Sequence, residues 1–316
     1  MTMTTNRIAT IAGGFDELFT RIELNPTRVK LASQRYDSVR RQIQSALPGT
    51  RVFQVGSFQR HTKIRPVTDS DPLDVDVAVC FGDFYHYVFD GSGIYPRQAL
   101  EATKMTLTQD GTYEAMEPES DAPTVVLEYF DGFKIEVIPC YRDLTGAYSR
   151  QPGPACYVVG SAAGNWVPAD YDYDAACISG ANQNPAVLQA LVPSIKMIKR
   201  FLRNYGIGLK SFHAEILCAL TVPLAVADWN GRNLRWGSQH VLAYFLSQAH
   251  RYLTGPVALP GSFSPPVDSG LSIYGLLEIG QKLAKFGEIA WKICKVEDEE
   301  QALDLWRQFY GDPFPA

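Results

Sequence analysis

Residues 56–79 read GSFQRHTKIRPVTDSDPLDVDVAV, a glycine-serine turn followed by two aspartates that alternate with valines. Successive side chains of a β-strand point to opposite faces, so Asp74 and Asp76 share one face and the valines share the other, which can be buried. At the usual strand rise the two α-carbons lie about 6.6 Å apart. Both carboxylates can then reach one or two divalent cations, which predicts metal-assisted phosphoryl chemistry.

A third acid follows on a predicted hairpin. Residues 124–130 are β-branched and aromatic, Asp131-Gly132 is a two-residue hairpin signal, and residues 133–138 form the second strand. Glu136 lies on the polar face of that second strand. If this strand lies beside the one with the aspartate pair, the three carboxylates share one surface, as in sites that hold two hard cations.

The aspartate pair must be weighed against a simpler interpretation. Acids on an alternating strand commonly form only its solvent-exposed face. Residues 73–81 are too apolar for an ordinary surface strand, however, and the Gly56-Ser57 turn lies upstream. A short helix that begins in this turn offers unpaired N–H groups and a favourable dipole to phosphates. Gly56 lets the backbone come close, and Ser57 can donate its hydroxyl.

The rest of the chain predicts one long helix before the strands and a helical second half. Asn25-Pro26 begins a helix that Pro48-Gly49 ends, and residues 51–55 form a strand. The Gly-, Pro-, Tyr- and Ala-rich residues 140–183 predict a lid or crossover outside the core. A helix kinked at Pro193 and three later helices follow, with apolar periods over residues 187–202, 238–253, 271–293 and 297–309.

Composition limits the class of protein. The chain has 316 residues, 46% hydrophobic and 20% charged, and a net charge of −5, which argues against a protein that coats long nucleic acid. We find no apolar run near 18 residues and no signal-peptide core, which predicts a cytoplasmic protein without a membrane span. Six scattered cysteines without a Cys-x-x-Cys motif predict reduced, packed thiols and no zinc site.

In chain order, these motifs resemble those of the polymerase-β-like nucleotidyltransferases. The similarity is greatest to the bacterial branch related to cyclic GMP-AMP synthase, the CD-NTases of anti-phage signalling. It spans about residues 50–220, and the ordered set is far more specific than any one motif. The matching stretches are Gly56-Ser57, Asp74-x-Asp76, residues 134–139 with Glu136, Asn184-Pro185, residues 195–201 with Lys199, and residues 209–215 with Ser211.

The resemblance implies an α/β (α+β) fold, with a nucleotidyltransferase core sheet, an N-terminal spine helix and a helical C-terminal lobe. It divides the chain into a catalytic core with the lid, residues 1–183, and a helical lobe, residues 184–316. The active site is expected in the cleft between the two.

The implied reaction joins nucleoside triphosphates, ATP, GTP or related ones, into a cyclic di- or trinucleotide and releases pyrophosphate. By resemblance Asp74, Asp76 and Glu136 are the catalytic metal ligands, for two Mg²⁺ or Mn²⁺ ions. The expected nucleotide-binding residues are Gln54, Gly56, Ser57, Lys199 and Ser211. One departure is Glu136, because many members carry aspartate there.

Several alternatives stay open. A non-cyclising nucleotidyltransferase that acts on RNA or protein would use the same acids, and a catalytically silent nucleotide sensor would bind triphosphates without turnover. Lys199 can instead belong to a solvated helix face, and Ser211 can be only an N-cap. The C-terminal Pro-Phe-Pro-Ala316 is expected to be exposed, as a site for a regulatory or conjugating protein partner.

Overall fold

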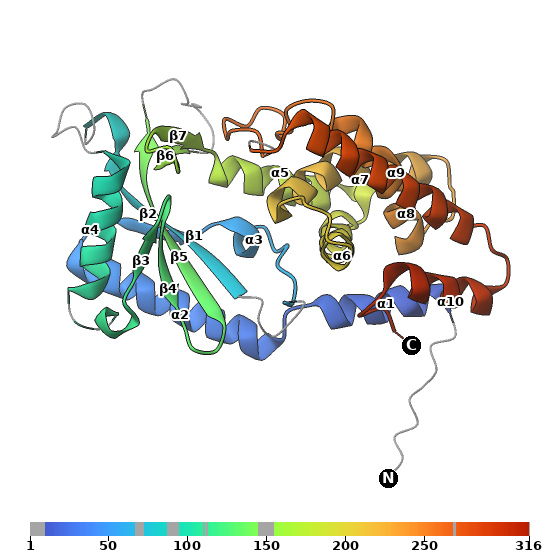
Figure 1. Cartoon of the computed structure of the whole chain (residues 1–316), viewed down its shortest axis with the longest axis horizontal. Coiled ribbons are helices and arrows are strands. Elements are labelled where there is room, and N and C mark those ends of the chain that lie inside the picture. The colour runs from blue at the N-terminus through green and yellow to red at the C-terminus, as the bar shows by residue number, and fades with distance from the viewer. Residues whose placement is uncertain are drawn as a thin grey trace, which may run out of the picture.

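A mixed β-sheet and a lobe of helices make up the two ends of the molecule (Figure 1). The computed structural model describes residues 10–66, 73–86, 95–109, 111, 113–144, 155–267 and 270–315. The first half contains α1 (Ile11–Ile22), α2 (Pro26–Ala46), β1 (Arg51–Gln54), α3 (Gly56–Gln59), β2 (Leu73–Asp83), α4 (Pro96–Thr108), η2 (Glu114–Met116), β3 (Glu119–Asp121), β4 (Thr124–Glu128) and β5 (Phe133–Asp143). The second half contains β6 (Cys156–Gly160), β7 (Trp166–Ala169), α5 (Tyr171–Gln183), η3 (Pro185–Val187), α6 (Leu191–Asn204), α7 (Ser211–Gly231), α8 (Ser238–Gln248), η4 (Ala249–Tyr252), α9 (Ile273–Ile293) and α10 (Glu299–Tyr310).

The sheet brings the two acid-bearing strands together. Its strand order is β1-β2-β5-β4-β3, and β6 pairs with the far end of β5 and with β7. β2 and β5 run parallel, with Asp74 opposite Lys134 and Asp76 opposite Glu136. The prediction that these strands are neighbours is therefore confirmed, although they lie 60 residues apart in the chain by that register.

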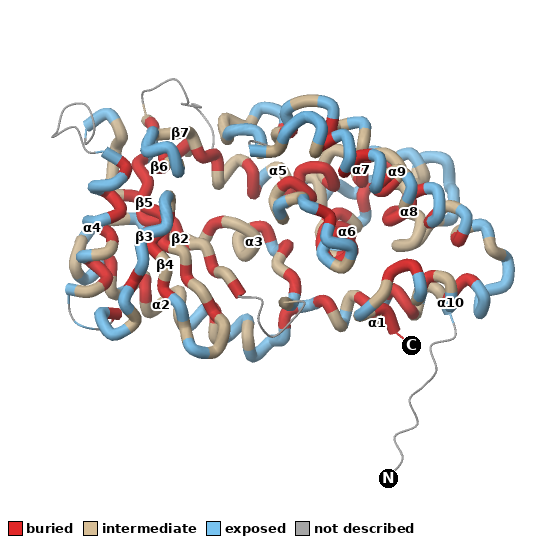
Figure 2. The backbone as a smooth tube through the Cα atoms, in the orientation of Figure 1, coloured by how far each residue is buried: buried red, intermediate tan, exposed pale blue. Residues whose placement is uncertain are grey.

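Each face of the sheet has a separate role. Alternate residues of β2 and β5 are fully buried beneath α2 and α4, among them Val75, Val77 and Ile135. Figure 2 shows these strands as largely buried, with the exposed chain at the outer surfaces of the flanking helices. Because side chains alternate along a strand, Asp74, Asp76 and Glu136 face the other way, toward the helical lobe.

The long helix α2 begins and ends where its sequence predicts. The Asn25 side chain accepts a hydrogen bond from the Thr27 amide at 2.8 Å, which caps the helix before Pro26. Arg35 then makes two hydrogen bonds to the Asp131 carboxylate, at 2.8 and 2.9 Å. This pair fastens the helix to the β4–β5 hairpin.

Some local expectations need correction. The β4–β5 turn has three residues, because the Tyr129 amide donates to the Phe133 carbonyl across the turn. Asn184-Pro185 opens only the short η3, and the lysine-bearing α6 begins six residues later at Leu191. Pro193 causes no kink, since it lies in the first turn of α6, where backbone N–H groups have no partner within the helix.

Residues 140–183 were predicted to lie outside the core, and this is wrong for β6. All five residues of β6 are buried, because the strand pairs with β5 on one side and β7 on the other. Tyr157, fully buried, belongs to a small cluster on the same side of the sheet as the acids. The predicted lid also included residues 145–154, which lie outside the described residues.

The helical lobe has its own hydrophobic core. That core includes Phe201, Leu217 and Trp306, and it also takes in Phe15 and Leu18 of α1 and Ile178 of α5. The division of the chain after residue 183 stays a prediction. The three predicted C-terminal helices are confirmed as α8 with η4, α9 and α10.

Helix α7 is long and apolar enough to cross a membrane by length and composition alone, contrary to the prediction that no such run exists. Ten of its residues are buried within the lobe, including Leu217, Val222 and Val226. A buried central helix meets the same criterion as a membrane span, so α7 is core. All six cysteines are free thiols and four of them are buried, as expected.

The expected exposure of the C-terminal segment is wrong for its described part. Phe314 is 7% exposed, and its ring packs edge-on against Phe15. The Pro315 carbonyl accepts a hydrogen bond from Arg307 at 2.8 Å. Apolar burial and this contact hold the segment in the helical lobe, whereas Ala316 lies outside the described residues.

Candidate active site

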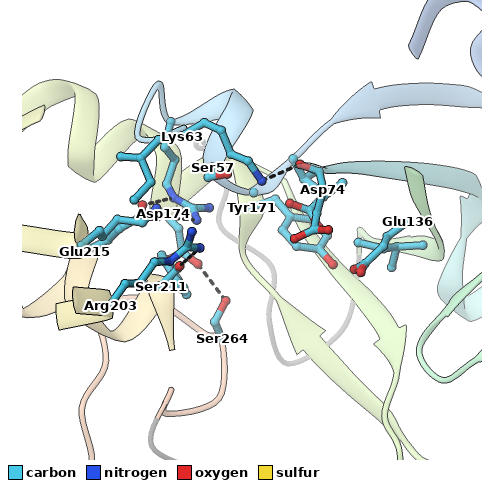
Figure 3. A pocket seen from close by; sticks show the side chains of 18 residues that line it. Ser57, Lys63, Asp74, Glu136, Tyr171, Asp174, Arg203, Ser211, Glu215 and Ser264 are labelled. Carbon is cyan, nitrogen blue, oxygen red and sulfur yellow. Dashed lines mark hydrogen bonds and ion pairs between the residues drawn. The ribbon is translucent and has the colours of Figure 1, made fainter. Parts of the chain in front are cut away.

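A pocket of about 340 Å³ lies between the polar face of the sheet and the helical lobe. Figure 3 shows Asp74 and Glu136 on the sheet side, with Lys63 reaching toward Asp74, and Arg203, Glu215 and Asp174 on the helical side. The sheet half contributes Val55, Gly56, Ser57, Arg60, Lys63, Ile64, Asp74, Asp76, Glu136 and Ile138. The helices and loops beyond contribute Tyr171, Asp174, Lys199, Arg203, Ser211, Phe212, Glu215 and Ser264.

The three predicted acids all line this pocket. Burial raises the pKa of Asp76, and the neighbouring Asp74 charge raises it further, against the attraction of Lys63. Burial and then the charges of Asp76 and Asp74 raise the pKa of Glu136 to about 7. Lys134, on the same strand, forms an ion pair with Glu128 and opposes the rise at Glu136 only in part. The acid face therefore carries poorly compensated negative charge.

Gly56 is required because the backbone passes directly over Asp76. Its φ is +68°, and a Cβ built at this position would lie 1.9 Å from the Asp76 Oδ2. Just before it, the Val55 amide donates to the Asp76 carbonyl at 3.0 Å. The turn and the second acid are thus held against each other, as the close-approach prediction for Gly56 requires.

A buried ion cluster forms the opposite wall. Lys199 is only 3% exposed, and its ammonium donates to the Glu215 carboxylate and to the Thr62 carbonyl, each at 3.0 Å. Arg60 donates to the same carboxylate at 2.7 Å. The alternative of a solvated face is therefore wrong for Lys199.

Two further cations complete the basic side of the pocket. The ammonium of Lys63 donates to the Asp74 carbonyl at 2.8 Å, and burial lowers the pKa of Lys63 against the attraction of Asp74 and Asp76. Arg203 lies 3.5 Å from the Ser211 hydroxyl. Ser211 is the first residue of α7 and not its N-cap, which is Lys210. Its hydroxyl is thus directed to the pocket without a capping role.

Of the predicted nucleotide-binding residues, Gly56, Ser57, Lys199 and Ser211 line the pocket, whereas Gln54 at the end of β1 does not. The sequence interpretation missed Arg60, Lys63 and Glu215, although each lies in a stretch already singled out. A charged residue within an apolar run, as at Glu215 in α7, was the available signal.

A second missed feature is the polar rim at the N-terminus of α5. The Asp174 carboxylate accepts hydrogen bonds from the hydroxyls of Ser262, at 2.7 Å, and Ser264, at 3.0 Å. Burial raises the pKa of Asp174, and these two bonds oppose the rise. They attach the loop around Ser264 to the pocket (Figure 3). No motif in the sequence marks this contact.

The acid face fits a divalent cation chemically. The Oδ1 atom of Asp74 is buried without a hydrogen-bond partner, and burial, followed by repulsion from Asp76 and Asp74, raises the pKa of Glu136. Carboxylate oxygens are the ligands that Mg²⁺ prefers. Within the described ranges no three His, Cys, Asp or Glu side chains are already grouped closely enough to hold an ion. The carboxylates must therefore move toward an ion that they bind.

Comparison with known proteins identifies this architecture. Residues 10–151 match the family model of the Second Messenger Oligonucleotide or Dinucleotide Synthetase domain. A curated relative, a probable cyclic nucleotide synthase of Bacillus cereus, is 22% identical over 290 residues, which cover 85% of this chain and 83% of the relative.

Solved structures of two bacterial proteins share the fold over almost the whole chain. The CD-NTase CdnG of Bradyrhizobium diazoefficiens, in complex with GTP, has a TM-score of 0.68 at 16% identity and covers 95% of each chain. CdnC of E. coli MS115-1 with ATP has a TM-score of 0.70 at 12% identity, over 96% of this chain and 99% of that one. CdnC in complex with HORMA-deltaN has a TM-score of 0.69 at 13% identity, over 97% and 99%. At these identities the structures establish the fold.

Residues 10–151 therefore carry a second-messenger synthetase domain, and the whole chain has the fold of the CD-NTase structures. Both the domain match and the curated relative indicate a probable cyclic nucleotide synthase. The family resemblance and the fold class predicted from the sequence are thereby confirmed.

Proposed function

We propose that this chain joins nucleoside triphosphates, ATP, GTP or related ones, into a cyclic di- or trinucleotide and releases pyrophosphate. The observation that carries the proposal is the parallel register that sets Asp76 opposite Glu136, with Asp74 on the same face and Gly56 against Asp76. This arrangement supports two-metal phosphoryl transfer beside a turn that can receive phosphates.

The proposed roles follow from position in the pocket. Asp74 and Asp76 would hold one divalent cation at the donor triphosphate, and Glu136 would help to hold a second one at the acceptor hydroxyl. Ser57, Lys199 and Ser211 contact the β- and γ-phosphates from the turn and the helical wall. Gln54 has a weaker claim, since it lies outside the residues that line the pocket.

In the proposed reaction the acceptor hydroxyl oxygen forms a bond to the α-phosphorus of the donor, the bond to pyrophosphate breaks with its electron pair on the departing pyrophosphate, and the hydroxyl proton passes to bulk solvent. Bound Mg²⁺ or Mn²⁺ lowers the pKa of the hydroxyl and offsets charge on the transferred phosphoryl group. The chain's own part is to fix the acids, hold the triphosphate in line and exclude water from the pocket.

The cellular setting is also a proposal. CdnG was solved with GTP and CdnC with ATP, which favours purine triphosphates as substrates here. By resemblance we assign the protein to bacterial anti-phage (CBASS) signalling in the cytoplasm. The complex of CdnC with HORMA-deltaN makes a regulatory protein of that type a candidate partner.

The decisive experiment incubates purified protein with labelled triphosphates and Mg²⁺ or Mn²⁺, then resolves the products by mass spectrometry with and without phosphatase. A phosphatase-resistant cyclic product supports the proposal. Incorporation that needs an RNA or protein acceptor would instead identify a non-cyclising transferase. Triphosphate binding without pyrophosphate release, in the presence of candidate partner protein, would identify a nucleotide sensor.

A further inference from the structure

Glu215 is the fully buried centre of the ion cluster that it forms with Arg60 and Lys199, and it connects the two halves of the molecule. Its carboxylate accepts from Arg60 Nε at 2.7 Å through Oε2 and from Lys199 Nζ at 3.0 Å through Oε1. Arg60 belongs to the sheet half, while Lys199 and Glu215 belong to α6 and α7 of the helical lobe. One carboxylate therefore bridges both sides of the pocket.

The connection continues directly into the glycine-serine turn. The Arg60 amide donates to the Gly56 carbonyl at 3.2 Å, and the Thr62 amide donates to the Ser57 carbonyl at 2.9 Å. Lys199 in turn donates to the Thr62 carbonyl at 3.0 Å. Two chains of hydrogen bonds therefore connect Glu215 to the turn, one through Arg60 and one through Lys199 and Thr62.

This bridge consists of three charged side chains that are all buried. Arg60 and Lys199 are both buried, and Glu215 is 0% exposed. Attraction to Arg60 and Lys199 holds the pKa of Glu215 below its usual range despite burial, so the carboxylate stays ionised. A buried cation without its partner is strongly unfavourable, hence both basic side chains are confined to positions within reach of this carboxylate.

We propose that Glu215 is a positioning residue that sets the distance between the glycine-serine turn and Lys199, and so aligns a bound triphosphate with Asp74 and Asp76. The proposal rests on the proposed nucleotidyl transfer and deepens it. Glu215 acts through Arg60 and Lys199 and does not itself contact the nucleotide, which its negative charge would repel.

The test compares Glu215→Gln with Asp312→Asn. Glutamine keeps the size and removes the charge, while Asp312 pairs with Arg200 on α6 at 3.3 Å, away from the pocket. Measured where both variants are fully folded by circular dichroism, Glu215→Gln should lower kcat at least about tenfold. Triphosphate affinity should change less, by about threefold at most, because the pocket keeps all its cations. Asp312→Asn should match the wild type in both.

Hydrogen exchange supplies a readout that is independent of activity. Without nucleotide, amides of residues 56–62 should exchange faster in Glu215→Gln, with no change in Asp312→Asn. If Glu215→Gln does not fold, Glu215→Asp takes its place, since it keeps the charge with a shorter reach. Unchanged kcat and unchanged exchange in the folded variant would overturn the positioning role. A wild type that forms no nucleotide product would instead count against the proposed function and leave the exchange result to decide this inference.

Discussion

Asp76 of β2 lies directly opposite Glu136 of β5 in a parallel pair of strands, and the backbone of Gly56 passes over Asp76. Two acids from distant segments and a tight turn are therefore fixed to one another by the backbone of the sheet. Such placement by main-chain hydrogen bonds leaves little freedom to the carboxylates beyond their side-chain rotation.

The first prediction concerns Asp76→Asn. This change should lower the rate of product formation to less than about one-hundredth of the wild-type rate, because a neutral amide is a poor ligand for a hard cation. The fold should stay intact. The matched control is Asp83→Asn, near the other end of β2 and outside the pocket. Pyrophosphate release and mass spectrometry measure both. Undiminished turnover in Asp76→Asn would remove the metal assignment.

Gly56→Ala tests the close approach of the turn to Asp76. A methyl group there would meet Asp76 Oδ2 at 1.9 Å, whereas Gly49, also at positive φ, has no atom within 4 Å. Both alanine variants should lose about 1–2 kcal/mol of stability from the left-handed backbone. Only Gly56→Ala should also lose turnover, by about tenfold or more, since it must displace the carboxylate. Equal activities of the two folded variants would contradict this.

The sequence alone was enough to predict that the three acids lie on polar strand faces. Alternation with a period of two assigns Asp74, Asp76 and Glu136 to polar strand faces, and apolar neighbours assign the other face to the core. That β2 and β5 would be adjacent, however, depended on the family resemblance, because pairing between distant strands has no local signature. The register observed between them is a property of the folded sheet.

The missed features share a different cause. The short run of β6 lies between Gly- and Pro-rich segments, so its composition indicated a loop, and only pairing with β5 and β7 makes it core. Glu215 is a charged residue whose burial depends on Arg60, which lies 155 residues away in the chain. A local pattern cannot supply such partners, which is why the sequence did not predict the ion cluster of Arg60, Lys199 and Glu215.

The pKa of Glu136, raised to about 7 from its usual 4.5, predicts a pH-dependent stability. The folded, metal-free protein holds this proton more tightly than the unfolded chain does. Its contribution to stability is therefore complete below about pH 4.5 and is lost as the pH rises through about 7. In EDTA, Glu136→Gln should match the wild-type Tm near about pH 5 and exceed it by about 2–4 °C near about pH 8.

Thermal unfolding at the two pH values measures this difference, and Mg²⁺ supplies the control. Added Mg²⁺ should raise the wild-type Tm at the higher pH and leave Glu136→Gln less affected, because the ion favours the ionised carboxylate. Equal Tm differences at both pH values would show that Glu136 titrates normally. Asp76, whose pKa burial also raises, adds to the slope in the same direction in both proteins.

Lys199→Met tests the proposed phosphate contact of Lys199 and its ion pair with Glu215. Loss of a charge-assisted phosphate contact should raise the apparent KM for triphosphate by about tenfold to a hundredfold. Because Lys199 is also a buried partner of Glu215, the variant should lose about 3 kcal/mol of stability, measured by denaturant unfolding. Lys196→Met is the control, since Lys196 lies on the same helix but pairs with Glu23 outside the pocket. A loss of stability with an unchanged KM would reduce Lys199 to a structural partner of Glu215.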